Sequence, residues 1–159
     1  MTEFYAAGKR FPLNRTYVMG ILNVTPDSFS DGSKYFDPEK AVRHAVEMEV
    51  QGVDIVDIGG QSTRPGSVRI SPEEEWARIE SVVKAVAEKT NLAISIDTFY
   101  PEVAEKALKA GAHIINDVTG FAPEMWRAVE NTDCGCIVMH PGDPDDVKGA
   151  GGDILERVR

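Results

Sequence analysis

Short apolar runs alternate with amphipathic stretches from Tyr17 onward. Each run is followed by a polar loop and then by apolar positions that recur at helical spacing, so each reads as a buried strand that leads into a helix. Strands that alternate with helices pair in parallel through right-handed crossovers, which defines an α/β fold. The predicted strands are Tyr17 to Leu22, Ile55 to Ile58, Leu92 to Ile96, His113 to Ile115 and Cys136 to Met139.

The helices between these strands have recognisable ends. Asp37 is a capping residue before Pro38, and Ser71-Pro72-Glu73-Glu74 has the form of a capping box with proline at the first helical position. Gly52 and Gly111 are expected to end two of the helices. The second helix has one apolar stripe that should face the sheet, formed by Trp76, Ile79, Val82, Val83 and Val86.

The polar residues that follow every predicted strand bear on the architecture. An open, doubly wound sheet would carry a G-x-G-x-x-G turn after its first strand, and N-V-T-P-D-S-F has no such pattern. In a (β/α)₈ barrel, by contrast, the carboxyl ends of the strands build one polar rim. The barrel is therefore favoured by the strand-end residues Asn23, Asp57, Gly59 to Arg64, Asp97-Thr98, Asn116-Asp117 and His140.

The length of the chain limits how much of a barrel it can hold. Five strand–helix units fit into its 159 residues, whereas a complete barrel typically takes about 250. We therefore expect residues 1–159 to be a single TIM-barrel domain, incomplete at the C-terminus and representing about the first five βα units. Residues 17–159 hold these units, and residues 1–16 are predicted to form a hairpin or lid under the barrel.

The composition and net charge of the chain limit the kinds of molecule that it can be expected to bind. The chain is 42% apolar and 27% charged, which is ordinary for a globular protein, and its formal net charge is −9. That charge argues against nucleic acid and anionic membranes, because phosphates are held by an excess of Lys and Arg. No stretch has the length of a membrane span and the N-terminus lacks a signal-peptide core, so we expect a cytoplasmic protein.

Cys134 and Cys136 match no standard zinc pattern, even with His140, and are expected to be reduced and packed.

Candidate chemistry gathers at the strand ends. Asp97 would lie at the mouth of an apolar barrel, where its charge is costly unless a ligand satisfies it, although a structural carboxylate bonded to backbone amides is the alternative. Only one of Asn116 and Asp117 can face the pocket, and we favour Asn116, whose amide suits a flat heterocycle with a mixed edge. The Asn23 carbonyl is a reasonable Mg²⁺ ligand, shared with a substrate phosphate. The loop from Gly59 to Gly66 is either an anion clamp or an ordinary βα connection.

Four short blocks, in the same order and spacing, resemble dihydropteroate synthases. The blocks are N-V-T-P-D-S-F-S-D-G from Asn23 to Gly32, G-G-Q-S-T-R-P-G from Gly59 to Gly66, S-I-D-T from Ser95 to Thr98 and H-I-I-N-D-V from His113 to Val118. The resemblance runs from about Tyr17 to His140 and implies the N-terminal part of a pterin-binding barrel. It implies a folate-pathway transferase that joins 4-aminobenzoate to (7,8-dihydropterin-6-yl)methyl diphosphate and releases diphosphate. It also implies a homodimer for the full-length protein.

The resemblance implies roles for individual residues. Asn23 corresponds to the Mg²⁺ ligand, and Asp97 and Asn116 correspond to contacts of the pterin ring, with Asp97 offsetting positive charge as the pterin methylene becomes cationic. The other implied residues are Ser62, Thr63 and Arg64 at the diphosphate and aminobenzoate, Phe29 and Asp31 in a loop that closes over the site, Pro65 in the aminobenzoate cleft with Phe29, and Met139 in the pterin-pocket wall. Asp97, Asp31 and Arg64 are the implied catalytic residues.

The chain departs from the family pattern in two ways. Gln61 stands where the family usually has glutamate, and the later D-P-G-x-G-F-G-K and S-R-K stretches and the final arginine–histidine pair are absent. We therefore expect the chain alone to be inactive. Two other readings are a corrinoid-linked methyltransferase with the same barrel, which has no need of the N-V-T-P-D-S-F-S-D-G loop, and a non-catalytic half barrel that pairs with another chain.

Overall fold

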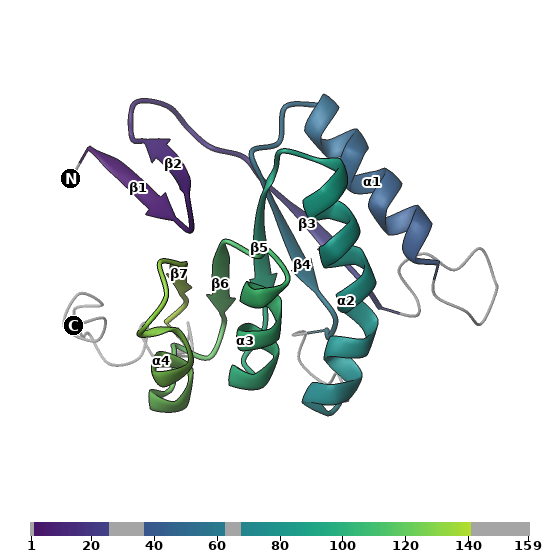
Figure 1. Cartoon of the computed structure of the whole chain (residues 1–159), viewed down its shortest axis with the longest axis vertical. Helices are drawn as coiled ribbons and strands as arrows, with labels where there is room; N and C mark the ends of the chain where they lie inside the picture. Colours follow the sequence, from purple (N-terminus) through teal and green to yellow (C-terminus); the bar gives the residue numbers. More distant parts are fainter. Residues whose placement is uncertain (1, 26–36, 63–67, 141–159) are drawn as a thin grey trace, which may run out of the picture.

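A parallel sheet of five strands lies at the centre of the computed structural model, which describes residues 2–25, 37–62 and 68–140 (Figure 1). The strands follow one another across the sheet in chain order, and every neighbouring pair is parallel. They are β3 (Met19–Asn23), β4 (Ile55–Gly59), β5 (Ala93–Asp97), β6 (Ile114–Asp117) and β7 (Gly135–Val138). Each predicted strand begins and ends within two residues of an observed one, so the α/β prediction is confirmed.

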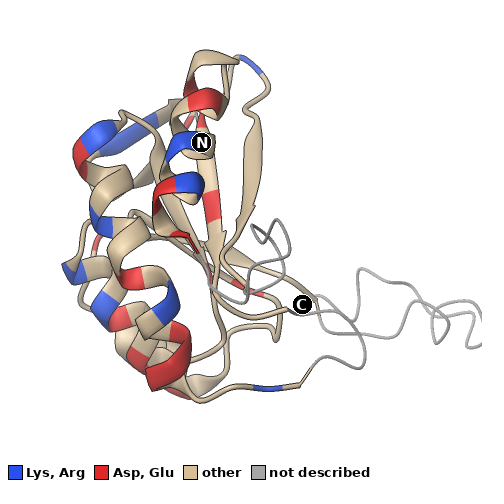
Figure 2. Ribbon diagram, turned by 90° about the vertical axis from the view of Figure 1, so that its right-hand side faces the viewer, with Lys and Arg blue, Asp and Glu red and all other residues tan. Residues whose placement is uncertain are grey.

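Four helices cover one face of this sheet (Figure 2). They are α1 (Pro38–Val50), α2 (Pro72–Lys89), α3 (Pro101–Lys109) and α4 (Pro123–Val129). A doubly wound sheet would reverse its strand order at a switch point and carry helices on both faces. Sequential strands with helices on one face are instead the winding of a (β/α) barrel. None of these helices, within the described part of the chain, is long and apolar enough to cross a membrane.

The helix ends follow the predicted signals. Asp37 Oδ1 accepts a hydrogen bond from the backbone N–H of Glu39 at 3.0 Å, and proline follows it in the first turn of α1. Ser71 Oγ accepts from the N–H of Glu74 at 3.2 Å at the start of α2. Gly52 follows α1 with a φ of +91°, a conformation that glycine adopts without the steric cost of a Cβ.

The apolar core lies between the sheet and the helices. Leu22, Ile58 and Ile96, which alternate with the polar strand-end residues, are fully buried there. The predicted stripe of α2 packs on the same core through Ile79, Val82, Val83 and Val86. Trp76 is only half-buried, whereas its neighbour Glu75 is completely buried.

The N-terminal residues form the predicted hairpin. Strands β1 (Glu3–Ala6) and β2 (Lys9–Pro12) pair antiparallel. Their buried residues Ala6 and Phe11 pack against side chains near the amino ends of the sheet strands. They lie on the face that none of the described helices covers, called below the face without helices. The hairpin therefore closes the end of that face opposite to the polar strand ends.

One prediction about the first sheet strand is wrong. The run from Val18 to Leu22 was expected to be buried, but Met19 is 38% exposed and Ile21 is 66% exposed. Strand β3 is the edge of the described sheet, and both side chains project from the face that carries no helices. Only Leu22, on the helix side, is buried in this strand.

Candidate active site

The strand ends bring three predicted site residues into one row. Asn23 lies opposite Gly59, Gly59 opposite Asp97, and Asp97 opposite Asn116 in the sheet register. Residues in register on neighbouring parallel strands point to the same side, which here is the face without helices. We call Asn23, Gly59, Asp97 and Asn116 the strand-end row.

Gly59 leaves the middle of the strand-end row without a side chain. A Cβ placed on Gly59 would lie 3.5 Å from Asp97 Oδ2 and 3.8 Å from Asn23 Oδ1. The carboxylate and amide oxygens therefore border the same small space. A ligand that lies over Gly59 can reach both of them.

Asp97 carries a carboxyl group that the described residues leave unsatisfied. Its Oδ1 is buried and has no hydrogen-bond partner among them. Burial, together with the charges of Asp57 and Asp117, raises the pKa of Asp97 to about 6. The alternative of a structural carboxylate bonded to backbone amides finds no support at Oδ1, which is typical of a group that awaits a ligand.

Asn116 is held by a buried acid. Its Nδ2 donates a hydrogen bond to Asp57 Oδ2 at 3.0 Å. Asp57 is only 6% exposed, and burial raises its pKa, opposed in part by Ser95 and Asn116. Sequence reasoning placed Asp57 at the polar rim but gave it no role, although an acid inside the apolar run I-V-D-I-G was a usable signal.

Asp117 points to the other side of β6, as strand alternation predicts. Its Oδ1 accepts hydrogen bonds from the N–H and hydroxyl of Thr119, both at 2.7 Å, and its Oδ2 accepts from the N–H of Phe121 at 3.1 Å. Phe121 has a φ of +59°, so these bonds hold an unfavourable turn after the strand. Asp117 therefore has a local structural task, and Asn116 is the member of the pair that faces the strand-end row.

A second buried acid, Glu75, supports the site from α2. Its Oε2 accepts a hydrogen bond from Thr98 Oγ1 at 2.8 Å, and Thr98 Oγ1 accepts from the N–H of Tyr100 at 3.1 Å. Burial raises the pKa of Glu75 to about 7, with a contribution from the charge of Asp97, while Thr98 and Arg78 lower it. Sequence reasoning missed Glu75, because only the tertiary fold brings Thr98 to it.

The remaining predicted residues fall into two groups. Ser62 is half-buried directly after β4, next to Gln61, whose Oε1 accepts a hydrogen bond from the N–H of Ile70 at 2.8 Å. Met139 follows β7 and is 48% exposed. The others lie outside the described residues: Phe29, Asp31, Thr63, Arg64 and Pro65.

The cysteines show no sign of metal chemistry in the described part of the chain. Cys134 and Cys136 are half-buried and free, and no group of three His, Cys, Asp or Glu residues there could hold a metal ion. Burial, together with the neighbouring Cys134, raises the pKa of Cys136 to about 12. A thiol with so high a pKa is a poor nucleophile and a poor ligand.

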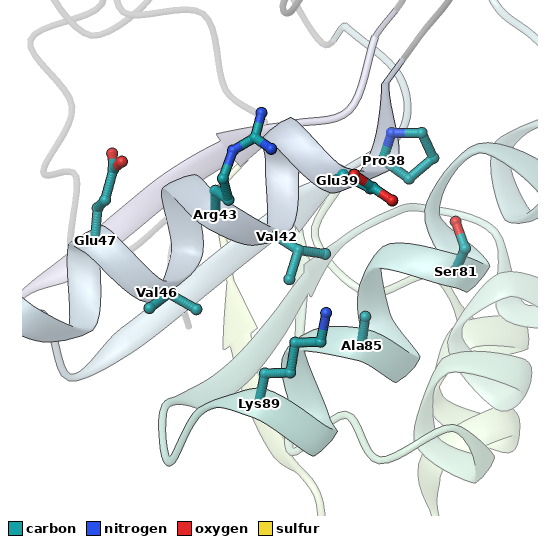
Figure 3. A pocket seen from close by; sticks show the side chains of 9 residues that line it. All are labelled: Pro38, Glu39, Val42, Arg43, Val46, Glu47, Ser81, Ala85 and Lys89. Carbon is teal, nitrogen blue, oxygen red and sulfur yellow. The ribbon is translucent and has the colours of Figure 1, made fainter.

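A hollow elsewhere on the molecule is separate from the strand-end row. It has a volume of about 610 Å³ and lies between α1 and α2, where Val42, Val46 and Ala85 are bordered by charged side chains (Figure 3). The strand-end row faces the opposite side of the sheet. This hollow therefore takes no part in the site.

Comparison with known proteins shows the family of the chain. Residues 19–159 match the family model described as pterin binding enzyme. The chain belongs to the family of pterin-binding enzymes. Its fold is thus the predicted barrel, of which the described residues contain five strands.

The relatives of this chain include several dihydropteroate synthases. It is 46% identical to that of Clostridium beijerinckii over 147 residues, which cover 91% of this chain and 55% of the relative. It is 43% identical to that of Escherichia coli K12 over 150 residues, which cover 93% and 53%. The chain thus spans about half the length of the curated relatives it matches.

Solved structures of dihydropteroate synthases have the same fold. The Xanthomonas albilineans enzyme with 4-aminobenzoic acid superposes with a TM-score of 0.85 at 41% identity, covering 99% of this chain and 60% of that one. The Clostridium difficile enzyme, solved in the presence of pteroic acid, gives a TM-score of 0.81 at 43% identity, with 90% and 54% covered.

Proposed function

We propose that this pterin-binding enzyme is a dihydropteroate synthase, which condenses (7,8-dihydropterin-6-yl)methyl diphosphate with 4-aminobenzoate and releases diphosphate. The observation that carries the proposal is the strand-end row, in a chain that is 43–46% identical to dihydropteroate synthases. Relatives have been solved with 4-aminobenzoic acid and in the presence of pteroic acid, which supports these substrates.

The pterin would bind at the Asp97 and Asn116 end of the strand-end row. With a pKa of about 6, Asp97 is largely ionised above pH 7. Its carboxylate can accept hydrogen bonds from ring N–H groups and stabilise positive charge that develops on the pterin as the carbon–oxygen bond to diphosphate breaks. Asp97 is half-buried, and this stabilisation is stronger at a partly buried group than in bulk water.

The diphosphate would bind at the Asn23 end, together with Mg²⁺. Mg²⁺ prefers oxygen ligands and is commonly held by one or two protein groups, substrate phosphates and water. The residues of the site fit this pattern, because Asn23 offers an amide oxygen in the exposed part of the row and no larger cluster of metal ligands occurs in the described residues. When bound, the ion would stabilise the departing diphosphate.

The other predicted contacts belong to the same proposal. Ser62, Thr63 and Arg64 would meet the diphosphate and aminobenzoate, and Met139 would form part of the pterin-pocket wall. Phe29, Asp31 and Pro65 would cover the aminobenzoate and keep water from competing with the arylamine. A cytoplasmic location and a homodimer of the full-length protein stay predictions from the sequence.

A chimera tests the proposed activity. The matching segment of the Escherichia coli enzyme, which is 43% identical, would be replaced by this chain and assayed with both substrates and Mg²⁺. We expect turnover by the chimera and no turnover by the chain alone. Asp97→Asn in the chimera should lower kcat/KM by about 100-fold, because it removes a charge that stabilises the transition state.

The matched control changes an aspartate outside the site. Asp54→Asn, at the amino end of β4, should leave kcat/KM within about twofold, because the Asp54 carboxylate bonds Arg15 and Val18, away from the strand-end row. A folded chimera that makes no dihydropteroate, or one that tolerates Asp97→Asn, would refute the proposed function.

A further inference from the structure

We propose that Asp57 is a positioning residue of the pterin site, which fixes the Asn116 amide so that its carbonyl oxygen, rather than its N–H groups, faces the ligand. The inference rests on the proposed function and names a residue that acts through Asn116.

The sheet register places Asp57 beneath the strand-end row. Asp57 lies opposite Ser95, two residues before the level of Gly59 and Asp97, and on the same face of the sheet. Asn116, on β6, reaches back across β5 to Asp57 on β4 through the 3.0 Å bond from its Nδ2. The oxygen and nitrogen of an amide lie on opposite sides of its Cγ. An amide whose nitrogen is turned down toward Asp57 therefore turns its oxygen toward the carboxyl end of the sheet.

Burial makes this orientation strongly preferred. Asp57 is 6% exposed, and among the described residues it forms no ion pair with Lys or Arg. Its Oδ1 has no hydrogen-bond partner of good geometry there, so the Asn116 N–H and the nearby Ser95 hydroxyl are the groups that stabilise this buried acid. A hydrogen bond to an ionised acceptor is roughly twice as strong as one between neutral groups. The reverse orientation would place the amide oxygen against an oxygen of the buried Asp57 carboxylate, where no hydrogen bond can form.

The consequence is a row of acceptors. Asn23 Oδ1, Asp97 Oδ2 and the outward Asn116 oxygen would meet the ligand together. Such a row selects a heterocycle edge rich in N–H donors, such as the 2-amino edge of a pterin, over an edge that presents a carbonyl. A freely rotating amide would also accept an edge that mixes donors and acceptors, so the fixed amide binds a smaller range of ligands. Asp57 thus contributes to specificity without touching the ligand.

Binding selectivity distinguishes this role from simple structural support. The probes are 6-hydroxymethylpterin and 6-hydroxymethyllumazine, in which an oxo group replaces the 2-amino group, and the measurement is the ratio of their dissociation constants for the chain. We expect Asp57→Ala to lower the preference for the pterin by roughly tenfold, because the freed amide can turn to either ligand. Asp57→Asn, which keeps an acceptor, should lower it less. Asp54→Asn is the control and should leave the ratio unchanged.

A second measurement does not depend on ligand binding. In the ¹⁵N-labelled chain, the side-chain NH₂ signals of Asn116 should shift with pH as the bonded Asp57 carboxyl titrates, and Asp57→Asn should abolish the shift. A pH-independent Asn116 signal, or an unchanged binding ratio in folded Asp57→Ala, overturns the inference. If neither the unaltered chain nor the chimera binds pterin, the proposed function fails, and the Asn116 signals still decide the role of Asp57.

Discussion

Two carboxyl groups in and beside β4 have pKa values that are shifted in opposite directions. Asp54, at the amino end, bonds the Arg15 guanidinium and the N–H of Val18, and these contacts lower its pKa. Asp57, nearer the carboxyl end, has its pKa raised by burial, as do Asp97 and Glu75. The acids around the strand-end row therefore cost folding free energy when ionised, which is typical of groups retained for function.

Replacing Asp97 should stabilise the chain in a pH-dependent way. The folded pKa, about 6, lies above the ordinary aspartate value of 3.8, so the stability contributed by the protonated acid is complete below the unfolded pKa and is lost as pH rises through 6. We expect the unfolding free energy of Asp97→Asn, relative to the unaltered chain, to rise by about 1 kcal/mol from pH 5 to pH 8, allowing for partial exposure. Urea denaturation at both pH values checks this. Asp54→Asn should instead be destabilising at neutral pH, and a pH-independent Asp97→Asn difference would contradict the account.

Replacing Glu75 should also stabilise the chain in a pH-dependent way, and by a larger free energy than replacing Asp97. Its folded pKa is about 7, whereas the ordinary glutamate value is 4.5, and its side chain is almost completely buried. The stability gained by Glu75→Gln should therefore grow by roughly 2 kcal/mol between pH 5 and pH 8. Thr98→Val, which removes the hydroxyl that donates to Glu75, should have the opposite sign at pH 8. Equal stability of both variants at pH 8 would show that Glu75 is not ionised there.

The junction between β4 and α2 depends on a close approach of two elements. A Cβ on Gly60 would lie 2.9 Å from Ile79 Cγ2 and 3.0 Å from the backbone oxygen of Glu75, and Arg78 donates to the Gly60 carbonyl at 3.0 Å. Helix α2 therefore packs directly on the chain that leaves the strand-end row. The loop that begins at Gly60 is held by the same helix that carries Glu75.

Gly60→Ala should consequently destabilise the fold by about 1–3 kcal/mol, because the helix backbone cannot yield as a flexible side chain would. Gly52→Ala is the comparison, since a Cβ there meets nothing within 4 Å and the cost of about 1 kcal/mol arises from its positive φ alone. Chemical denaturation of both variants measures the difference. A Gly60→Ala chain as stable as the unaltered one would contradict the observed packing.

The helices and strands could be predicted from the sequence more completely than the contacts between them. Strands and caps follow from local patterns, such as the run Ile55 to Ile58 and the cap at Ser71. The exposure of Ile21 was not predictable, because an apolar run does not say which of its faces is covered. The bond between Asn116 and Asp57 joins residues 59 positions apart, and no local pattern encodes such a pairing.

At the scale of the whole molecule, the two faces of the sheet have different roles. The face with helices carries the main apolar core, while the other face is closed at its amino end by the hairpin and presents the strand-end row at its carboxyl end. Three predicted residues, Asn23, Asp97 and Asn116, come together there because parallel strands end at one edge. Asp57 and Glu75, which support them, became visible only in the folded chain. The predicted contacts from Phe29 to Asp31 and from Thr63 to Pro65 lie outside the described residues.

Chemical-shift mapping would locate the pterin on the chain. The ¹⁵N-labelled chain would be titrated with 6-hydroxymethylpterin, and the backbone and side-chain amide signals followed. We predict that the largest changes occur at Asn23, Gly59, Asp97 and Asn116, and that Asp97→Asn abolishes them. Largest changes at the hollow between α1 and α2, or a response that survives Asp97→Asn, would contradict the assignment of the strand-end row as the pterin site.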